Sequence, residues 1–342
     1  MHIFIDETGS FSGIGEFPSV SLVGALVVPD ERLASLEKQY NRLSRNFPRD
    51  DRGEVKGRAL TEKQVASLIP MLFEHSTLFD ATGVDVGAHT EDGLKQFQAE
   101  QAERMTNNLT DKHSATLTKQ VWAYRDKFEK FKLPLMIQTM ATFELIPKLI
   151  ELSTNYYATR RPTELAEFHW TIDAKGNLDT PNQWEEWWST VIMPFLQSRS
   201  FKQPFKMLPV GDYSKMKRFD VEPDDFIKEM SAWTEGDPPP LDIKAIISDN
   251  LQFRSDTCPG LELVDILTNA TRRAMNGNLQ KEGWRRIPEL MIHRNPQYIN
   301  LIALEDLPKR VYPYSRIVNA YSRGGRALLP AKLHRQALKR AK

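Results

Sequence analysis

An apolar run that ends in two adjacent acids opens the chain. The residues from Ile3 to Ile5 are followed at once by Asp6 and Glu7, and then by the turn-forming stretch Thr8-Gly9-Ser10. Because the run lacks the alternation of a half-exposed strand, it predicts a strand covered on both faces, as in sheets flanked by helices. Ligands in such sheets collect at the carboxyl ends of the strands, so Asp6 stands where an active site is expected.

The two acids are not equivalent in such a strand. Successive side chains point to opposite faces, so Asp6 and Glu7 reach the same ligand only if Gly9 lets the chain bend early. We therefore rank Asp6 above Glu7 as the candidate site residue. The alternative for this stretch is a solvated acidic turn that follows an edge strand.

The length and composition restrict the class of protein. A chain of 342 residues with 40% hydrophobic residues can form one enlarged domain or two average ones around a large core. No apolar stretch is long enough to span a bilayer, and Asp6 and Glu7 interrupt any secretory signal, so we expect a cytoplasmic protein without a membrane partner. The single cysteine, Cys258, excludes internal disulfides and multi-cysteine zinc sites.

Charge is distributed unevenly along a chain whose formal net charge is only +1. No acidic residue follows Asp306, whereas the last stretch is rich in lysine and arginine. We treat residues 281–342 as a basic C-terminal extension. Such an extension either contacts a phosphate backbone or simply aids solubility.

The order of strand and helix signals predicts an α/β protein with a mixed sheet flanked by helices. Strands are expected at 20–28, 78–86, 168–172, 205–210 and 243–247, and helices are expected to begin near Asp30, Thr61, Pro134, Asn182 and Cys258. The polar segment from about 89 to 131 has helical propensity with a thin apolar stripe, which indicates an inserted helical arm. Trp184, Trp187 and Trp188 recur at helical spacing, which favours packing over a base-stacking role.

Two further aspartates share the setting of Asp6. The strand expected at 168–172 delivers Asp173 in the same way, and Asp265 lies between apolar residues of the last strong helix. Burial of an unpaired carboxylate is costly, so Asp265 needs a partner. Arg272 on the same helix face is the structural candidate, and a metal ion is the functional one.

Three carboxylates that meet in one site repel one another unless a cation neutralises them. Magnesium or manganese is the natural cation, because both prefer hard oxygen ligands. Two such ions about 4 Å apart can activate water and stabilise the leaving oxygen of a phosphodiester. The aspartates therefore indicate phosphodiester hydrolysis.

Four short motifs resemble an uncharacterised, mostly bacterial family catalogued as domain of unknown function 3800. They are Ile5-Asp6-Glu7-Thr8-Gly9, Glu54-Val55-Lys56-Gly57, Ile172-Asp173 and Gly260-Leu261-Glu262-Leu263-Val264-Asp265, and together they span about the first 280 residues. The resemblance implies an RNase H-like fold over residues 1–280, with the arm inserted at about 89–131, and a metal-dependent nuclease activity.

The resemblance also implies roles for individual residues. The acidic positions of the family fall on Asp6, Asp173 and Asp265, with Glu7 and Glu54 as further candidates and Lys56 as a phosphate or carboxylate partner. The family commonly has Gln where this chain has Glu262, Ala where it has Val264, and Ser where it has Thr8. None of these departures removes an acid. Without the resemblance, Glu54 and Lys56 could equally form an exposed ion pair of little energetic weight.

The leading hypothesis is a nuclease that uses Mg²⁺ or Mn²⁺ to hydrolyse DNA or RNA by a two-metal carboxylate mechanism. The main alternative is a non-catalytic RNase H-like module that binds nucleic acid or a protein partner. A third hypothesis keeps the metal and replaces the polymer by a nucleotide or a small phosphoester. In each case the helical arm is a candidate surface for a homodimer or a protein partner.

Overall fold

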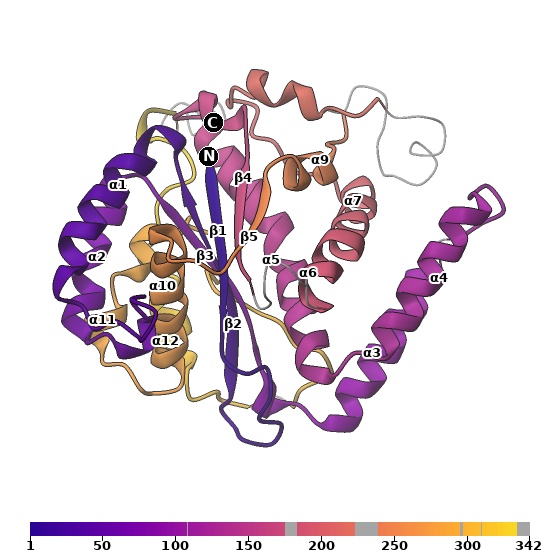
Figure 1. Ribbon diagram of the computed structural model, residues 1–342, viewed down its shortest axis with the longest axis horizontal. Helices are drawn as coiled ribbons and strands as arrows, with labels where there is room; N and C mark the ends of the chain where they lie inside the picture. Colours follow the sequence, from indigo (N-terminus) through magenta and orange to yellow (C-terminus); the bar gives the residue numbers. More distant parts are fainter. Residues whose placement is uncertain (108, 175–182, 223–238, 295–296, 309, 334–342) are drawn as a thin grey trace, which may run out of the picture.

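A mixed six-stranded sheet lies at the centre of the protein (Figure 1). The structure is a computed structural model that describes residues 1–342 except 108, 175–182, 223–238, 295–296, 309 and 334–342. The sheet has the order β5-β4-β1-β2-β3-β6, and β2 alone runs antiparallel to the other strands. Its strands are β1 (His2–Thr8), β2 (Val20–Val28), β3 (Leu78–Asp85), β4 (His169–Asp173), β5 (Leu251–Arg254) and β6 (Asn300–Leu301).

Helices cover both faces of this sheet (Figure 1). One face carries α1 (Asp30–Leu43), α2 (Glu62–Glu74), α10 (Pro259–Met275), α11 (Lys281–Trp284) and α12 (Ser315–Tyr321). The other carries α5 (Leu133–Ala158), α6 (Gln183–Trp187), the π-helical turn η5 (Trp188–Ile192), α7 (Met193–Lys202) and α9 (Ile243–Ser248). The α/β sandwich predicted from the order of the elements is confirmed.

The first strand shows how the sequence sets this layering. Ile3 and Ile5 pack into the core that includes α5, whereas Phe4 packs into the core that includes α10. The neighbouring strand β2 is buried along its whole length. Apolar runs without alternation therefore mark strands covered on both faces, as the sequence predicted.

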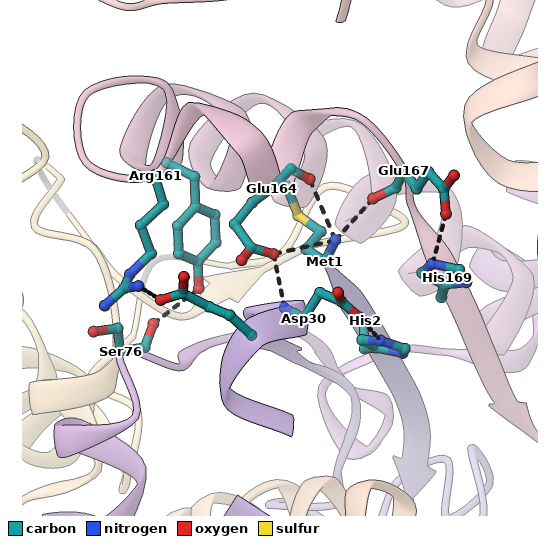
Figure 2. Close-up of polar contacts among 10 residues, drawn as sticks. Met1, His2, Asp30, Ser76, Arg161, Glu164, Glu167 and His169 are labelled. Atoms are coloured by element: carbon teal, nitrogen blue, oxygen red, sulfur yellow. Dashed lines mark hydrogen bonds and ion pairs between the residues drawn. The ribbon is translucent and has the colours of Figure 1, made fainter. Parts of the chain in front are cut away.

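Polar contacts fix the start of β1 beside the segment that leads into β4. The ammonium group of Met1 donates to the backbone oxygens of Glu164 at 3.2 Å and Glu167 at 2.8 Å, and it lies 3.3 Å from the Glu164 carboxylate (Figure 2). The same carboxylate accepts the backbone N–H of Asp30 at 2.7 Å. Glu164 thus joins the beginnings of β1 and α1, which helps to set β1 parallel to β4.

The segment expected as a helical arm is a helical hairpin. Helices α3 (Glu91–Thr106) and α4 (Ala115–Glu129) contact each other and project from one side of the body (Figure 1). At the base of the hairpin, the Gln98 amide donates to the backbone oxygens of Phe128 at 2.7 Å and Phe131 at 3.1 Å. Both rings pack on Trp187, which is almost fully buried, so the tryptophan serves in packing as predicted.

Two predicted strands are wrong. Residues 243–247 form helix α9, because Asp242 caps the Ala245 N–H at 2.8 Å and Ile243, Ile246 and Ile247 recur at helical spacing on its buried side. Residues 205–210 form no strand, since Asn155 on α5 bonds the Lys206 oxygen and the Leu208 N–H in place of a neighbouring strand. The fifth strand is instead β5, which follows α9 directly.

The region expected as a basic extension contributes to the sheet and its core. Strand β6 pairs with β3, and Ile287, Tyr298 and Tyr321 are fully buried on the face that carries α2 and α10. Arg294 forms two hydrogen bonds with Asp80 on β3, at 2.7 and 2.8 Å. The last basic residues, from 334 onward, lie outside the described part of the chain.

Helix α5 is the only described helix long and apolar enough to cross a membrane. Half of its most apolar 18-residue stretch is buried inside the protein. Its long apolar sequence is thus used, at least in part, to cover the central sheet.

Candidate functional site

Asp6 and Asp173 lie at the carboxyl ends of neighbouring parallel strands. The register pairs Ile5 of β1 with Ile172 of β4, so the two aspartates occupy the next position on each strand. Because side chains alternate along a strand, Asp6 shares the face of Phe4, which packs with α10. Asp6 is 9% exposed, and one of its carboxylate oxygens accepts the Glu7 N–H at 2.7 Å.

Helix α10 supplies the third aspartate. Its first turn lies so close to β1 that a Cβ atom on Gly260 would be 2.3 Å from the Phe4 ring. Asp265, two turns along this helix, accepts the backbone N–H of Gly57 at 2.7 Å. Burial raises the pKa of the Asp265 carboxyl, and the nearby acids Glu54 and Asp173 raise it further, while Gly57 and Lys56 act in the opposite direction.

The loop before α2 places a cation among these acids. The Lys56 ammonium lies 2.6 Å from the Glu54 carboxylate, and both side chains are partly exposed. Burial lowers the pKa of Lys56, but the bond to Glu54 and the attraction of Glu54, Asp265 and Asp173 outweigh it, so the pKa is raised overall. Asp173, Asp265, Glu54 and Lys56 therefore act on one another electrostatically, which brings the predicted residues of three separate motifs into one site.

Glu262 holds this loop in place, a role that the sequence did not suggest. Its buried carboxylate accepts the Tyr40 hydroxyl at 2.6 Å and the Val55 N–H at 2.9 Å, and Arg49 approaches it to 3.7 Å. Burial and the bond to Glu262 raise the pKa of Tyr40. The only signal in the sequence was an acid inside an otherwise apolar helical stretch.

Gly57 and Asn269 also belong to the site and were missed. A Cβ atom on Gly57 would be 2.7 Å from the Ile266 Cα, so only glycine lets the loop approach α10 this closely. Asn269, one turn after Asp265, donates to the Thr8 hydroxyl at 3.1 Å. Its buried amide oxygen has no hydrogen-bond partner among the described residues.

Other candidates lie elsewhere. Alternation along β1 places Glu7 on the face opposite Asp6 and α10. Arg272, expected as the ion-pair partner of Asp265, donates instead to the backbone oxygen of Val20 at 3.0 Å. Asp265 and Arg272 are separated by two helical turns, which exceeds the reach of a direct contact.

The basic C-terminal region is engaged in packing where it is described. The Arg326 guanidinium lies over the Phe73 ring, 4.3 Å from its centre, and donates to the Glu289 backbone oxygen at 2.9 Å. Arg310 lies 3.7 Å from the centre of the Phe17 ring. These contacts are structural, and neither arginine belongs to the carboxylate site.

The donor chemistry of the site suits a hard divalent cation. Asp6 and Asp173 end neighbouring strands on the face that α10 covers, burial raises the pKa of Asp265, and the unpartnered Asn269 oxygen lies on the same helix as Asp265. As the side chains stand, no three acidic, histidine or cysteine residues within the described ranges are close enough together to hold a metal ion. The Lys56 ammonium provides the positive charge near Asp173 and Asp265 in this arrangement.

Comparisons of the chain with protein-family models, with curated proteins and with solved structures give no match.

Proposed function

We propose that the protein is a divalent-metal-dependent nuclease that hydrolyses phosphodiester bonds of DNA or RNA. The observation that carries this proposal is the placement of Asp6 and Asp173 at adjacent strand ends, beneath the helix that bears Asp265. This placement supports a single site formed by acids from three distant parts of the chain, at the carboxyl end of the central strands, where ligands bind in sheets of this kind.

The sheet supports the RNase H-like fold that forms part of this proposal. Strand β1 lies between β4 and β2, and β2 alone runs against the other strands. This is the arrangement expected of an RNase H-like sheet. The hairpin α3–α4 and the region from β6 onward are additions to that core.

Asp6, Asp173 and Asp265 would hold Mg²⁺ or Mn²⁺, with Glu54 as a further oxygen ligand. When bound, the metal supplies Lewis acidity and a water of lowered pKa for attack on phosphorus. The Gly57 N–H orients the Asp265 carboxylate, and Glu262 fixes the loop that carries Glu54. Lys56 is positioned to contact a phosphate oxygen once its bond to Glu54 is released.

The alternative function is a non-catalytic module that binds nucleic acid or a protein. The ion pair between Lys56 and Glu54 favours it, because a protein cation already offsets the negative charge of the site. In that case the carboxylates serve stability and no metal is needed.

The test is cleavage of labelled single- and double-stranded DNA, RNA and RNA–DNA hybrid with Mg²⁺, Mn²⁺ or chelator. We expect metal-dependent cleavage that falls about a hundredfold or more in Asp6→Asn and in Asp173→Asn, since each removes an ionic ligand. Asp126→Asn, an exposed change on α4, is the matched control and should cleave normally.

Metal binding is measured in parallel by calorimetry on the same variants. If no substrate is cut and the wild-type protein binds neither ion, the nuclease proposal fails in favour of the non-catalytic module. Binding without cleavage of any polymer would instead point to a small phosphoester substrate.

A further inference from the structure

A large apolar cavity lies between the helical hairpin and the body, on the face of the sheet opposite the carboxylate site. Its volume is about 800 Å³, within the range of small-molecule sites. Half-buried apolar side chains from three helices line it, including Val121 on α4, Met140 and Phe143 on α5, and Phe195 on α7. Helix α4 therefore forms one wall of this apolar cavity, and α5 and α7 form the other (the helices are labelled in Figure 1).

Two buried aromatic rings form the wall of the cavity near the base of the hairpin. Phe128, near the end of α4, and Trp187, at the end of α6, both line it and are almost fully buried. Their rings stack with centroids 5.8 Å apart. A partner helix that ran through the groove would meet these rings, whereas the end of a flexible chain could rest on them.

Positive charge lies elsewhere in the lining of the cavity. Lys202 is the last residue of α7, Lys244 lies in the first turn of α9, and Arg104 lies in the last turn of α3. All three line the cavity and are exposed. Gln197 joins α7 to α9, because its amide donates to the Leu241 backbone oxygen at 2.9 Å and accepts the Lys244 N–H at 3.1 Å.

Within the described residues, these cations have no acidic neighbour in the lining of the cavity. No described residue that lines it is acidic, and none of the three cations forms an ion pair within the described part of the chain. Trp187 and Lys202 are separated by nearly continuous helix, about 20 Å at 1.5 Å per residue. The lining of the cavity is thus apolar near Phe128 and Trp187 and cationic near Lys202 and Lys244.

We propose that this cavity binds a long-chain carboxylate, with the hydrocarbon tail directed toward Phe128 and Trp187 and the carboxylate near Lys202 and Lys244. Tail burial provides the affinity, and the cations select the charge of the headgroup. The proposal is independent of the nuclease activity, because the cavity and the carboxylate site lie on opposite faces of the sheet.

The test is calorimetric titration of the full-length protein with saturated carboxylates of increasing length, each below its micelle concentration. We expect affinity to rise about fourfold for each added methylene until the cavity is filled. Dodecyltrimethylammonium, which has the same alkyl tail as tridecanoate and the opposite charge, should bind at least about tenfold more weakly than tridecanoate.

Two variants separate the tail from the headgroup. Val121→Trp places a larger side chain in the cavity and should weaken dodecanoate binding about tenfold or more, with the fold checked by circular dichroism. The double change Lys202→Glu with Lys244→Glu alters exposed residues only and should weaken binding about tenfold or more. Lys119→Glu, an exposed change on α4 outside the cavity, should bind as the wild type does.

Equal binding of the cationic and anionic amphiphiles would overturn the proposal, as would affinity that does not depend on chain length. An acidic amphipathic peptide is titrated as the competing occupant. Binding of that peptide, with no binding of dodecanoate, would mean that the cavity takes a protein helix instead.

Discussion

The backbone N–H of Gly57 donates to the Asp265 carboxylate across 2.7 Å, and this contact joins the loop of Glu54 and Lys56 to helix α10. A second anchor is Glu262, one turn earlier on the same helix, which accepts the Val55 N–H, and Arg273 on this helix also donates to the Gly57 oxygen at 3.2 Å. The helix therefore supplies Asp265 and also positions the loop that supplies Glu54 and Lys56. Changes at either anchor should affect the fold and the site together.

Asp265 should reduce the stability of the metal-free protein. Because burial raises its pKa above the ordinary value of 3.8, the folded state binds the proton more tightly than the unfolded state does. The free energy of unfolding therefore falls as the pH rises from 3.8 through the pKa of Asp265 in the folded state. At pH 7 it remains below its value at low pH. We expect Asp265→Asn, which can still accept the Gly57 N–H, to raise this free energy by about 1 kcal/mol at pH 7.

Urea unfolding at pH 7 and near pH 4, with chelator present, measures this effect. The gain from Asp265→Asn should shrink at the lower pH, because the raised pKa of Asp265 makes protonation of the folded-state carboxyl more complete there than at pH 7. Asp256→Asn is the control, because that exposed carboxylate pairs with Arg254 and should give no gain. A loss of stability in Asp265→Asn at pH 7 would show that the carboxylate is stabilising as it stands.

Gly57→Ala should displace the loop from α10. The added Cβ would lie 2.7 Å from the Ile266 Cα. Because the clash is between backbone segments, the loop or the helix would have to move to relieve it. We expect a loss of about 1–3 kcal/mol in the free energy of unfolding and a weaker response to Mn²⁺. Arg58→Ala, at the next and exposed position, is the control, and an equal loss in both variants would argue against close packing as the cause.

Replacement of Glu262 by leucine should lower the free energy of unfolding more than replacement by glutamine does. Glu262→Gln keeps an acceptor for the Val55 N–H, whereas Glu262→Leu leaves that group and the Tyr40 hydroxyl buried without a partner. We expect the leucine variant to lose about 3 kcal/mol of unfolding free energy and the glutamine variant clearly less. Thermal and urea unfolding of both variants and of Tyr40→Phe would show which lost hydrogen bond accounts for the decrease in unfolding free energy, that of the Tyr40 hydroxyl or that of the Val55 N–H.

Much of the site could be predicted because strand ends leave a clear trace in the sequence. Asp6 and Asp173 each follow an apolar run, and such runs end where a covered sheet meets solvent. The start and end of α10 were also readable, from Pro259 in its first turn and from Gly277, which adopts a φ of +76° just after the helix.

The remainder depended on contacts that a sequence does not encode locally. The register of β1 against β4 brings Asp6 beside Asp173, and nothing in either strand fixes that register alone. In the sequence, Glu262 is only a departure from a motif. Its role depends on the hydrogen bonds that it accepts from Tyr40 and Val55, which are distant in the chain. Residues 243–247 are a short apolar run, which suits a strand or a helix equally well until its neighbours decide.

The region after residue 280 should prove essential to the fold. Ile287 is fully buried on the face that carries α10, whereas Val311 is 90% exposed. We expect Ile287→Ala to lower the free energy of unfolding by about 2–5 kcal/mol, because it leaves a cavity in the core, and Val311→Ala to leave it unchanged. Truncation after residue 280 should prevent cooperative unfolding, as it removes β6 and the buried Tyr298 and Tyr321. If the truncated chain unfolds with the same midpoint as the full chain, residues 281–342 form a separate extension after all.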